Sequence, residues 1–301
     1  GQPIAVHRDF SDDGRKLPLR PHTSLNAHHR YKVVLTGILD QAGLIMNSTQ
    51  WSFTTGEFND RDAPVITALS IGDGATAVPI NGRLRILFDE VISPFSVPGS
   101  LRLEAQDVEV AGSLELAKDR RSVTFTPSQP LASNGVYRVI VDGFYDDSGN
   151  RLPASSSQFM TSQTTTADKL PPKASIIPGS GLRDVGVNAT ISLSFDEEID
   201  VTSLDEGIRI LVEGFSGEVA GHFSYQDRLA TFHPYAPFPG NKRIDVRVEG
   251  VKDWAGNTLV TSSQFVTGAA MDLTPPSLLA ISPQDGALDV DTLAPIVLTF
   301  S

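Results

Sequence analysis

Apolar and polar residues alternate along several short stretches of the chain. Tyr137, Val139 and Val141 would share one face of an extended segment, with Arg138 on the other face. The segment 244–248 repeats this alternation. A period of two is that of a β-strand with one buried face, which is typical of an antiparallel sheet. The pattern therefore predicts β-structure in these segments.

Three sequence patterns recur at a nearly constant spacing. The glycine of an Asp-x-x-Gly turn recurs after 106 and then 107 residues, and the phenylalanine of a Phe-x-Thr ending recurs twice after 106 residues. A proline-containing turn followed by an alternating strand, first seen at 21–35, returns at 127–141 and 234–248. These anchors agree to within one residue, so they indicate a repeated structural unit. The glycines are Gly43, Gly149 and Gly256, and the phenylalanines are Phe53, Phe159 and Phe265.

A fourth anchor, a strand that ends at Phe88, Phe195 and Phe300, marks the first half of each copy. The predicted domains are 1–61 (C-terminal part of a repeat), 62–167 and 168–271 (complete repeats), and 272–301 (N-terminal strands of a further repeat). Each complete copy holds about seven alternating segments, which predicts an all-β fold of tandem immunoglobulin-like (Ig-like) antiparallel β-sandwiches arranged end to end. The segment Ser203–Glu206 looks like a capping box and supports a single helical turn at most.

These anchors resemble the bacterial Ig-like repeat first associated with S-layer proteins. That repeat has a Pro-led first strand, a Tyr-x-Val strand, an Asp-x-(Ala/Ser)-Gly-Asn turn and a closing Phe-x-Thr. The chain departs from it at Ile244 in place of Tyr, at Phe238 in place of Leu and at Leu44 in place of Asn. The resemblance implies the Ig-like fold and an extracellular or cell-surface location in a bacterium. Such repeats occur in surface-layer proteins, adhesins, proteins with Rhs-type repeats and secreted enzymes, so the resemblance implies no single function.

The net charge and the composition exclude several kinds of partner and chemistry. The 301 residues carry a formal net charge of −12 and no run rich in Lys or Arg, so we predict no nucleic-acid binding. No apolar stretch approaches the roughly 20 residues of a spanning helix, so we expect no membrane span in this segment. The absence of cysteine excludes disulfides, a cysteine zinc site and a cysteine nucleophile, and it suits an exported protein.

We predict that the chain is not an enzyme. It has no Gly-x-Ser-x-Gly elbow, phosphate loop or dinucleotide fingerprint. Paired acids occur at 89–90 and 196–198, but they recur at the same position of two repeats, which favours a structural role. None of the six histidines recurs between the copies.

The connections between the copies suggest a role. A sandwich with an odd number of strands receives the chain at one pole and releases it at the other, so tandem copies would stack into a rod. The connectors 56–63, 162–171 and 268–275 are short, and two of them end in Pro-Pro, which is typical of semi-rigid spacers. We predict a structural spacer or stalk in a bacterial cell-surface or secreted protein, with the neighbouring repeats as partners. The alternatives are a glycan- or protein-binding module and accessory domains of a secreted polysaccharide-active enzyme.

Acidic residues concentrate where the linker, the turn after the second strand and the Asp-x-x-Gly turn are expected to meet. Carboxylates are the ligands that calcium prefers, so we predict calcium at the domain junctions. The alternative is that these acids only cap their turns. The candidate ligands are Asp62, Asp89, Glu90 and Asp146 in the first complete repeat, and Asp168, Asp196, Glu197 and Asp253 in the second.

Trp254 is the remaining candidate. It lies inside the turn 253–257, where we expect it to be exposed. An exposed indole could stack on a sugar, which makes Trp254 a candidate ligand contact. The favoured alternative is that it packs against the neighbouring domain.

Overall fold

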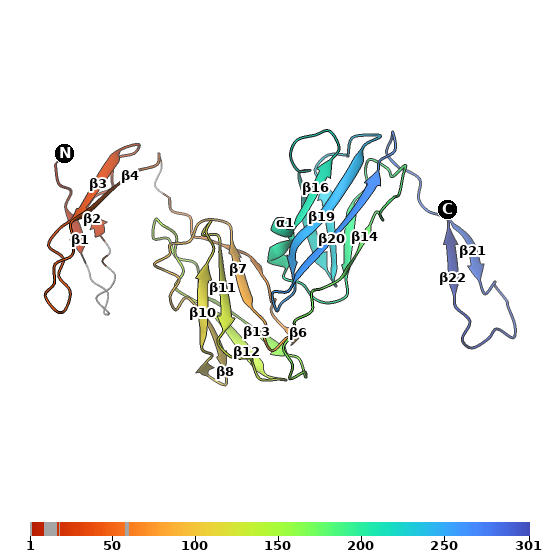
Figure 1. Ribbon diagram of the computed structural model, residues 1–301, viewed down its shortest axis with the longest axis horizontal. Coiled ribbons are helices and arrows are strands. Elements are labelled where there is room, and N and C mark those ends of the chain that lie inside the picture. The colour runs from red at the N-terminus through yellow and green to blue at the C-terminus, as the bar shows by residue number, and fades with distance from the viewer. Residues whose placement is uncertain (1, 9–16, 18, 58–59) are drawn as a thin grey trace. The chain divides into compact units, whose positions relative to one another are not determined.

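The computed structural model describes residues 2–8, 17, 19–57 and 60–301 (Figure 1). Strands make up 44% of the chain and helices 2%, which confirms the all-β prediction. The chain divides into two units, one formed chiefly by residues 1–63 and the other by the chain from Pro64 onward, and each is described by itself. Of the helices in the described residues, none is long and apolar enough to cross a membrane.

The first complete repeat forms a sandwich of two sheets, with strand orders β10-β11-β7-β5 and β6-β13-β12-β8-β9. Paired strands run antiparallel except β6 and β13, which are parallel. One sheet consists of β5 (Ile66–Leu69), β7 (Leu84–Phe88), β10 (Gly112–Leu116) and β11 (Ser122–Pro127). The other consists of β6 (Ala75–Val78), β8 (Leu101–Ala105), β9 (Val108–Glu109), β12 (Val136–Val141) and β13 (Ser155–Thr161).

The second complete repeat forms a sandwich of seven strands, with orders β14-β15-β18-β17 and β16-β19-β20. A parallel bridge between Val185 and Thr267 stands where the first sandwich has the pair β6–β13. One sheet consists of β14 (Ala174–Ile177), β15 (Ile191–Phe195), β17 (Gly221–Gln226) and β18 (Leu229–Pro234). The other consists of β16 (Ile208–Val212), β19 (Arg243–Lys252) and β20 (Thr258–Val266).

A short helical segment, η1 (Val201–Ser203) followed by α1 (Leu204–Gly207), joins the two sheets of the second sandwich. The predicted single turn is confirmed, but the predicted capping box is wrong. Asp200 caps the segment instead, because its Oδ1 accepts a hydrogen bond from the Thr202 amide at 2.9 Å. The Ser203 hydroxyl donates to the carbonyl of Asp200 and accepts from the amide of Lys252, so these two bonds use its hydrogen-bonding capacity.

The alternation that predicted the strands decides which side chains are buried. β12 buries every second residue, and so does the first half of β19. Each sandwich has its own apolar cluster, and ring pairs such as Phe238 and Phe265, with centroids 6.1 Å apart, lie inside it. The large side chains that the strands contribute to the two cores are buried: Phe88, Phe125, Tyr137, Val139 and Phe159 in the first sandwich, and Phe195, Phe232, Val246 and Phe265 in the second.

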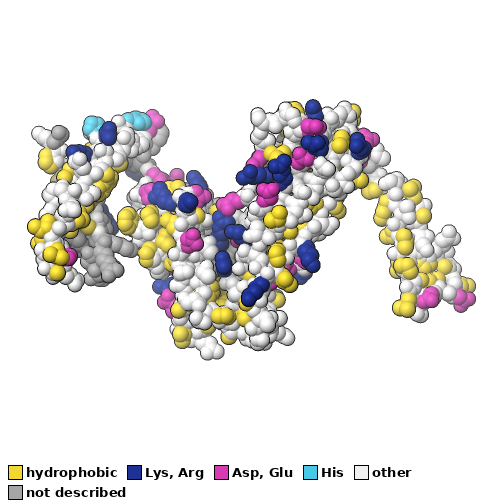
Figure 2. All heavy atoms as spheres, in the orientation of Figure 1, with side chains coloured by type: hydrophobic (Ala, Val, Ile, Leu, Met, Phe, Trp, Pro, Cys, Tyr) yellow, Lys and Arg dark blue, Asp and Glu magenta, His cyan; other side chains and the backbone are white. Residues whose placement is uncertain are grey.

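The segments before and after the sandwiches are hairpins with the register of a partial repeat. β1 (Val6–Arg8) pairs with β2 (Leu19–Pro21), β3 (Arg30–Leu35) pairs with β4 (Thr49–Thr54), and β21 (Leu278–Ser282) pairs with β22 (Val297–Phe300). Tyr31 faces Phe53 across β3 and β4, as Tyr137 faces Phe159 in the first sandwich. Tyr31 is only partly buried, and Phe53 and Phe300 are 41% and 56% exposed. Figure 2 shows hydrophobic side chains on the surface of the β21–β22 hairpin.

Candidate functional site

An asparagine side chain holds the linker that leaves each complete sandwich. Asn81 donates from Nδ2 to the carbonyl of Asp168 and accepts from its amide through Oδ1, both at 2.8 Å. Asn188 makes the same two bonds to Asp272, again at 2.8 Å. A side-chain amide that pairs with both backbone groups of one residue fixes its orientation as well as its position. We call this pair of bonds the linker clasp.

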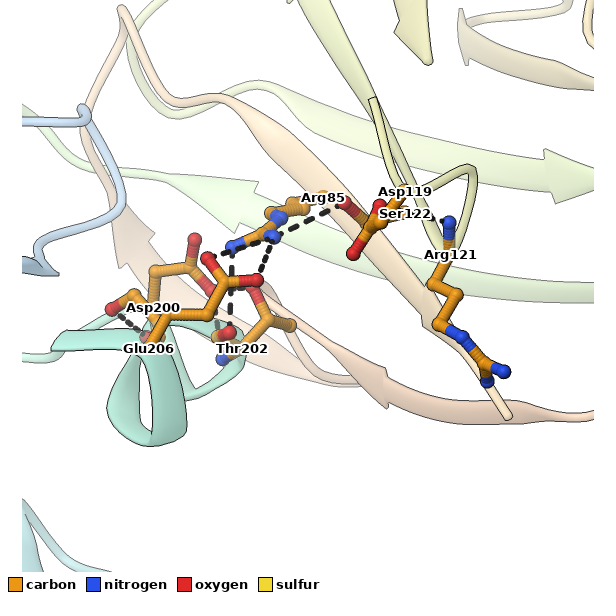
Figure 3. Close-up of polar contacts among 8 residues, drawn as sticks. Arg85, Asp119, Arg121, Ser122, Asp200, Thr202 and Glu206 are labelled. Atoms are coloured by element: carbon orange, nitrogen blue, oxygen red, sulfur yellow. Dashed lines mark hydrogen bonds and ion pairs between the residues drawn. The ribbon is translucent and has the colours of Figure 1, made fainter. Parts of the chain in front are cut away.

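Arg85, on β7 of the first sandwich, reaches the helical segment of the second (Figure 3). Its guanidinium donates to Glu206 Oε1 at 3.0 Å and to the carbonyl of Thr202 at 3.3 Å. It also donates to Ser122 Oγ within its own domain at 3.1 Å, and its side chain is only 14% exposed. The Glu206 carboxylate is mostly exposed, so the contact adds orientation more than stability. The second sandwich has Ser192 at the position of Arg85, so this contact is specific to the junction between the two sandwiches.

Trp254 lies partly buried against the apolar core of the first sandwich, although it belongs to the second. The Arg83 amide of the first sandwich donates to the carbonyl of Trp254 at 2.7 Å. The indole Nε1 is buried and has no hydrogen-bond partner among the described residues. The ring therefore does not lie open on the surface, and its placement favours the packing role over contact with a sugar.

The turn that carries Trp254 is built around a buried carboxylate. Asp253 is 2% exposed, and its two oxygens accept from the amide and the side chain of Asn257 at 2.8 and 2.7 Å. Gly256 adopts φ +91°, a conformation that disfavours other residues. In the N-terminal repeat Leu44 still donates its amide to Asp40 Oδ1 at 2.9 Å, so the turn forms without the asparagine.

Two further carboxylates approach Asp253. Asp168 from the linker, Glu197 from the turn after β15 and Asp253 each bring an oxygen within 4.8 Å of the others. We call these three residues the carboxylate trio. Burial, and after it the charges of Asp168, Asp253 and Asp196, together raise the pKa of Glu197 to about 7 against the opposing charge of Arg228. Burial also raises the pKa of Asp253, while its hydrogen bonds from Asn257 oppose this.

The sequence profile described as the bacterial Ig-like domain matches residues 60–165 and 168–267, which is more than half of the chain. The chain belongs to the bacterial Ig-like domain family. Among curated proteins, no sequence matches it.

The solved structures that the chain matches include the N-terminal part of the bacterial S-layer protein SbsC. It is 10% identical, with a TM-score of 0.28, and the match covers 68% of this chain and 44% of that one. An L,D-transpeptidase from Mycobacterium smegmatis is 12% identical, with a TM-score of 0.26 and coverage of 68% and 89%. The present chain thus spans less than half of the SbsC fragment that it matches.

In each bacterial Ig-like domain, one of the predicted calcium ligands holds the start of the first strand. Asp89 Oδ1 accepts from the Val65 amide at 2.8 Å, and Asp196 Oδ1 accepts from the Lys173 amide at 2.7 Å. Both amides directly follow a proline of the Pro-led strand. The recurrence of aspartate at this position therefore has a structural explanation, and Asp196 lies outside the carboxylate trio.

The prediction of Asp62 as the linker carboxylate needs a correction. Asp168 and Asp272 lie four residues before Pro172 and Pro276, and the residue four before Pro64 is Asp60. Asp60 also accepts, through Oδ1, the amide of the residue two positions on, as Asp168 and Asp272 do. Asp60 is thus the equivalent residue, and alignment on the proline identifies it. The domain from Pro64 onward holds Glu90 and a 1% exposed Asp146, the equivalents of Glu197 and Asp253.

Proposed function

We propose that this segment is a non-catalytic spacer, or part of a stalk, in a bacterial cell-surface or secreted multidomain protein. The observation that carries this proposal is the linker clasp, which occurs at the outgoing end of both complete domains. A repeated clasp gives each connection the same local geometry. A short linker with its backbone held in this way transmits orientation from one domain to the next, as a spacer requires.

Membership of the bacterial Ig-like family supports an extracellular or surface location. The absence of cysteine is compatible with export. The partners that we propose are the neighbouring Ig-like repeats, together with a glycan or a protein at the cell surface. A glycan-binding role for Trp254 is the weaker candidate, because the ring packs against the first sandwich.

Loss of the clasp is expected to loosen the junction between the two sandwiches. Because the chain has no cysteine, spin labels can be attached selectively at two introduced cysteines. Ser128→Cys lies at an exposed position of the first sandwich, and Val260→Cys lies at an exposed position of the second. Pulsed electron spin resonance should give a narrow distance distribution for the labelled parent and a broader one for Asn81→Ala. Asn188→Ala is the matched control, since it frees the following linker and should leave the distribution narrow. Equal widths for the parent and Asn81→Ala would contradict the spacer proposal.

We also propose that the carboxylate trio binds calcium and that the ion stiffens the junction. Calcium binds oxygens at 2.3–2.6 Å, so two oxygens on one ion lie at most about 5.2 Å apart. The oxygens of the trio lie within 4.8 Å of one another, which is close enough to share an ion. The specific observation in favour of calcium is that the buried Asp253 and the half-buried Glu197 lie close to a third carboxylate, that of Asp168. Without a cation their mutual repulsion opposes folding, and an ion would relieve it.

The calcium proposal makes a prediction that depends on pH. The pKa of Glu197 is raised from 4.5 to about 7, so its proton stabilises the folded state fully below pH 4.5, and this contribution disappears as pH rises through 7. Calcium should therefore raise the melting temperature of the second domain more at pH 8 than at pH 5. In the absence of calcium, Glu197→Gln should remove much of the loss of stability between these pH values.

The matched control for this experiment is Asp205→Asn, which neutralises an exposed acid of α1 outside the trio. It should keep the full response to calcium, whereas Glu197→Gln should lose it. Equal responses in the two variants would show that the trio holds no ion, and that these acids only shape their turns.

A further inference from the structure

Two histidines stand directly opposite each other at the edge of the second sandwich. β17 is the outer strand of its sheet, and His222 on β17 is the register partner of His233 on β18. The next pair along, Phe223 and Phe232, is packed with the core cluster. Since side chains alternate between the two faces of a strand, both imidazoles lie on the outer face. His222 is exposed and His233 is partly buried.

The two rings already lie close together. Their centroids are 5.1 Å apart, and the ring planes differ by 20°. Ser224 Oγ lies 3.1 Å from His233 Nε2, and the ring of Tyr235 lies 5.7 Å from that of His222. The site thus gathers two imidazoles, a hydroxyl and a phenol on one edge hairpin.

We propose that His222 and His233 together bind one divalent transition-metal ion, of the class of Cu²⁺, Ni²⁺ or Zn²⁺. Imidazole nitrogen is a preferred ligand of these ions. Residues directly opposite on antiparallel strands have Cβ atoms about 4.5–5.5 Å apart, and imidazole nitrogens bind zinc at about 2.0–2.1 Å, so two such rings can converge on one ion by rotating their side chains. Water completes the coordination, which makes this an open site that binds more weakly than a four-ligand structural site.

The first sandwich provides an internal comparison. At the same register its β10 and β11 carry Ser113 and Thr126, which supply no imidazole. A bound ion would tie the edge strand β17 to β18 in the second domain alone. It would therefore stabilise one sandwich and leave its neighbour unaffected.

Cu²⁺ titration of the complete chain, prepared without a histidine tag, tests the proposal. Electron spin resonance should show an ion bound to two imidazole nitrogens, and His222→Asn and His233→Asn should each lower the affinity at least about tenfold. The double variant His28→Asn/His29→Asn removes the other adjacent histidines and is the matched control, expected to keep this signal.

A second measurement separates loss of the site from loss of the fold. Ni²⁺ should raise the melting temperature of the second sandwich and not that of the first, and the two asparagine variants should melt like the parent in the absence of metal. Copper binding that survives in both variants, or that disappears only in the His28→Asn/His29→Asn control, would overturn the assignment. The same holds if Ni²⁺ stabilises neither domain.

Discussion

Replacing Phe265 by alanine is expected to lower the free energy of unfolding of the second sandwich by about 3–5 kcal/mol. Phe265 lies on β20, is 1% exposed and packs edge-on against Phe238. The truncation removes buried apolar surface and leaves a cavity that the surrounding strands can fill only in part. Denaturant unfolding, followed separately for the two sandwiches, measures the loss.

Two comparisons make this result specific to burial. Val260 lies on the same strand but is 74% exposed, so Val260→Ala should change the stability by no more than about 0.5 kcal/mol. Phe53 occupies the repeat position of Phe265 in the N-terminal segment, where it is 41% exposed, so Phe53→Ala should cost clearly less than Phe265→Ala. Comparable losses for Phe265→Ala and Phe53→Ala, with Val260→Ala unchanged, would mean that the repeat position, and not the packing, determines the cost.

Much of the fold was predictable because each signal is local or periodic. The alternation in 137–141 and 244–248 identified the buried faces of β12 and β19 without knowledge of their partners. The constant spacing of Gly149 and Gly256 and of Phe159 and Phe265 then identified two copies of one sandwich. The prediction of a capping box at 203–206 failed because the Ser203 hydroxyl bonds instead to the carbonyl of Asp200, three residues back, and to the amide of Lys252 on β19.

The junction was harder to predict because its contacts join residues far apart in the sequence. Asn81 and Asp168 lie 87 positions apart, and only the recurrence of asparagine 107 residues later, at Asn188, could have marked the clasp. The sequence predicts Asp253 at a domain junction as a candidate calcium ligand, but it does not predict that the residue is only 2% exposed. Packing of a turn residue such as Trp254 against a neighbouring domain leaves no period in the sequence of the turn itself.

The position of Trp254 against the first sandwich gives a second prediction with a large expected effect on stability. Trp254→Ala is expected to destabilise the first sandwich by about 2 kcal/mol or more, although the residue belongs to the second. The reason is that the indole covers part of the apolar core of the first domain. Full burial of a tryptophan would give a loss of about 3–5 kcal/mol, and partial burial reduces it. Separate unfolding transitions of the two sandwiches, with and without the substitution, measure the effect.

Trp254→Phe and Trp51→Ala complete the experiment. The phenylalanine variant keeps a ring in the contact and removes the buried Nε1, whose missing partner costs about 1–3 kcal/mol, so it should be close to the parent in stability or above it. Trp51 is 48% exposed in the N-terminal segment, and its truncation should leave the first sandwich unchanged. If Trp254→Ala shifts only the transition of the second sandwich, the two domains unfold independently, and the indole serves its own turn. A shift of the first transition would instead show that the first sandwich depends on the second for part of its stability, because a side chain of the second sandwich covers its core.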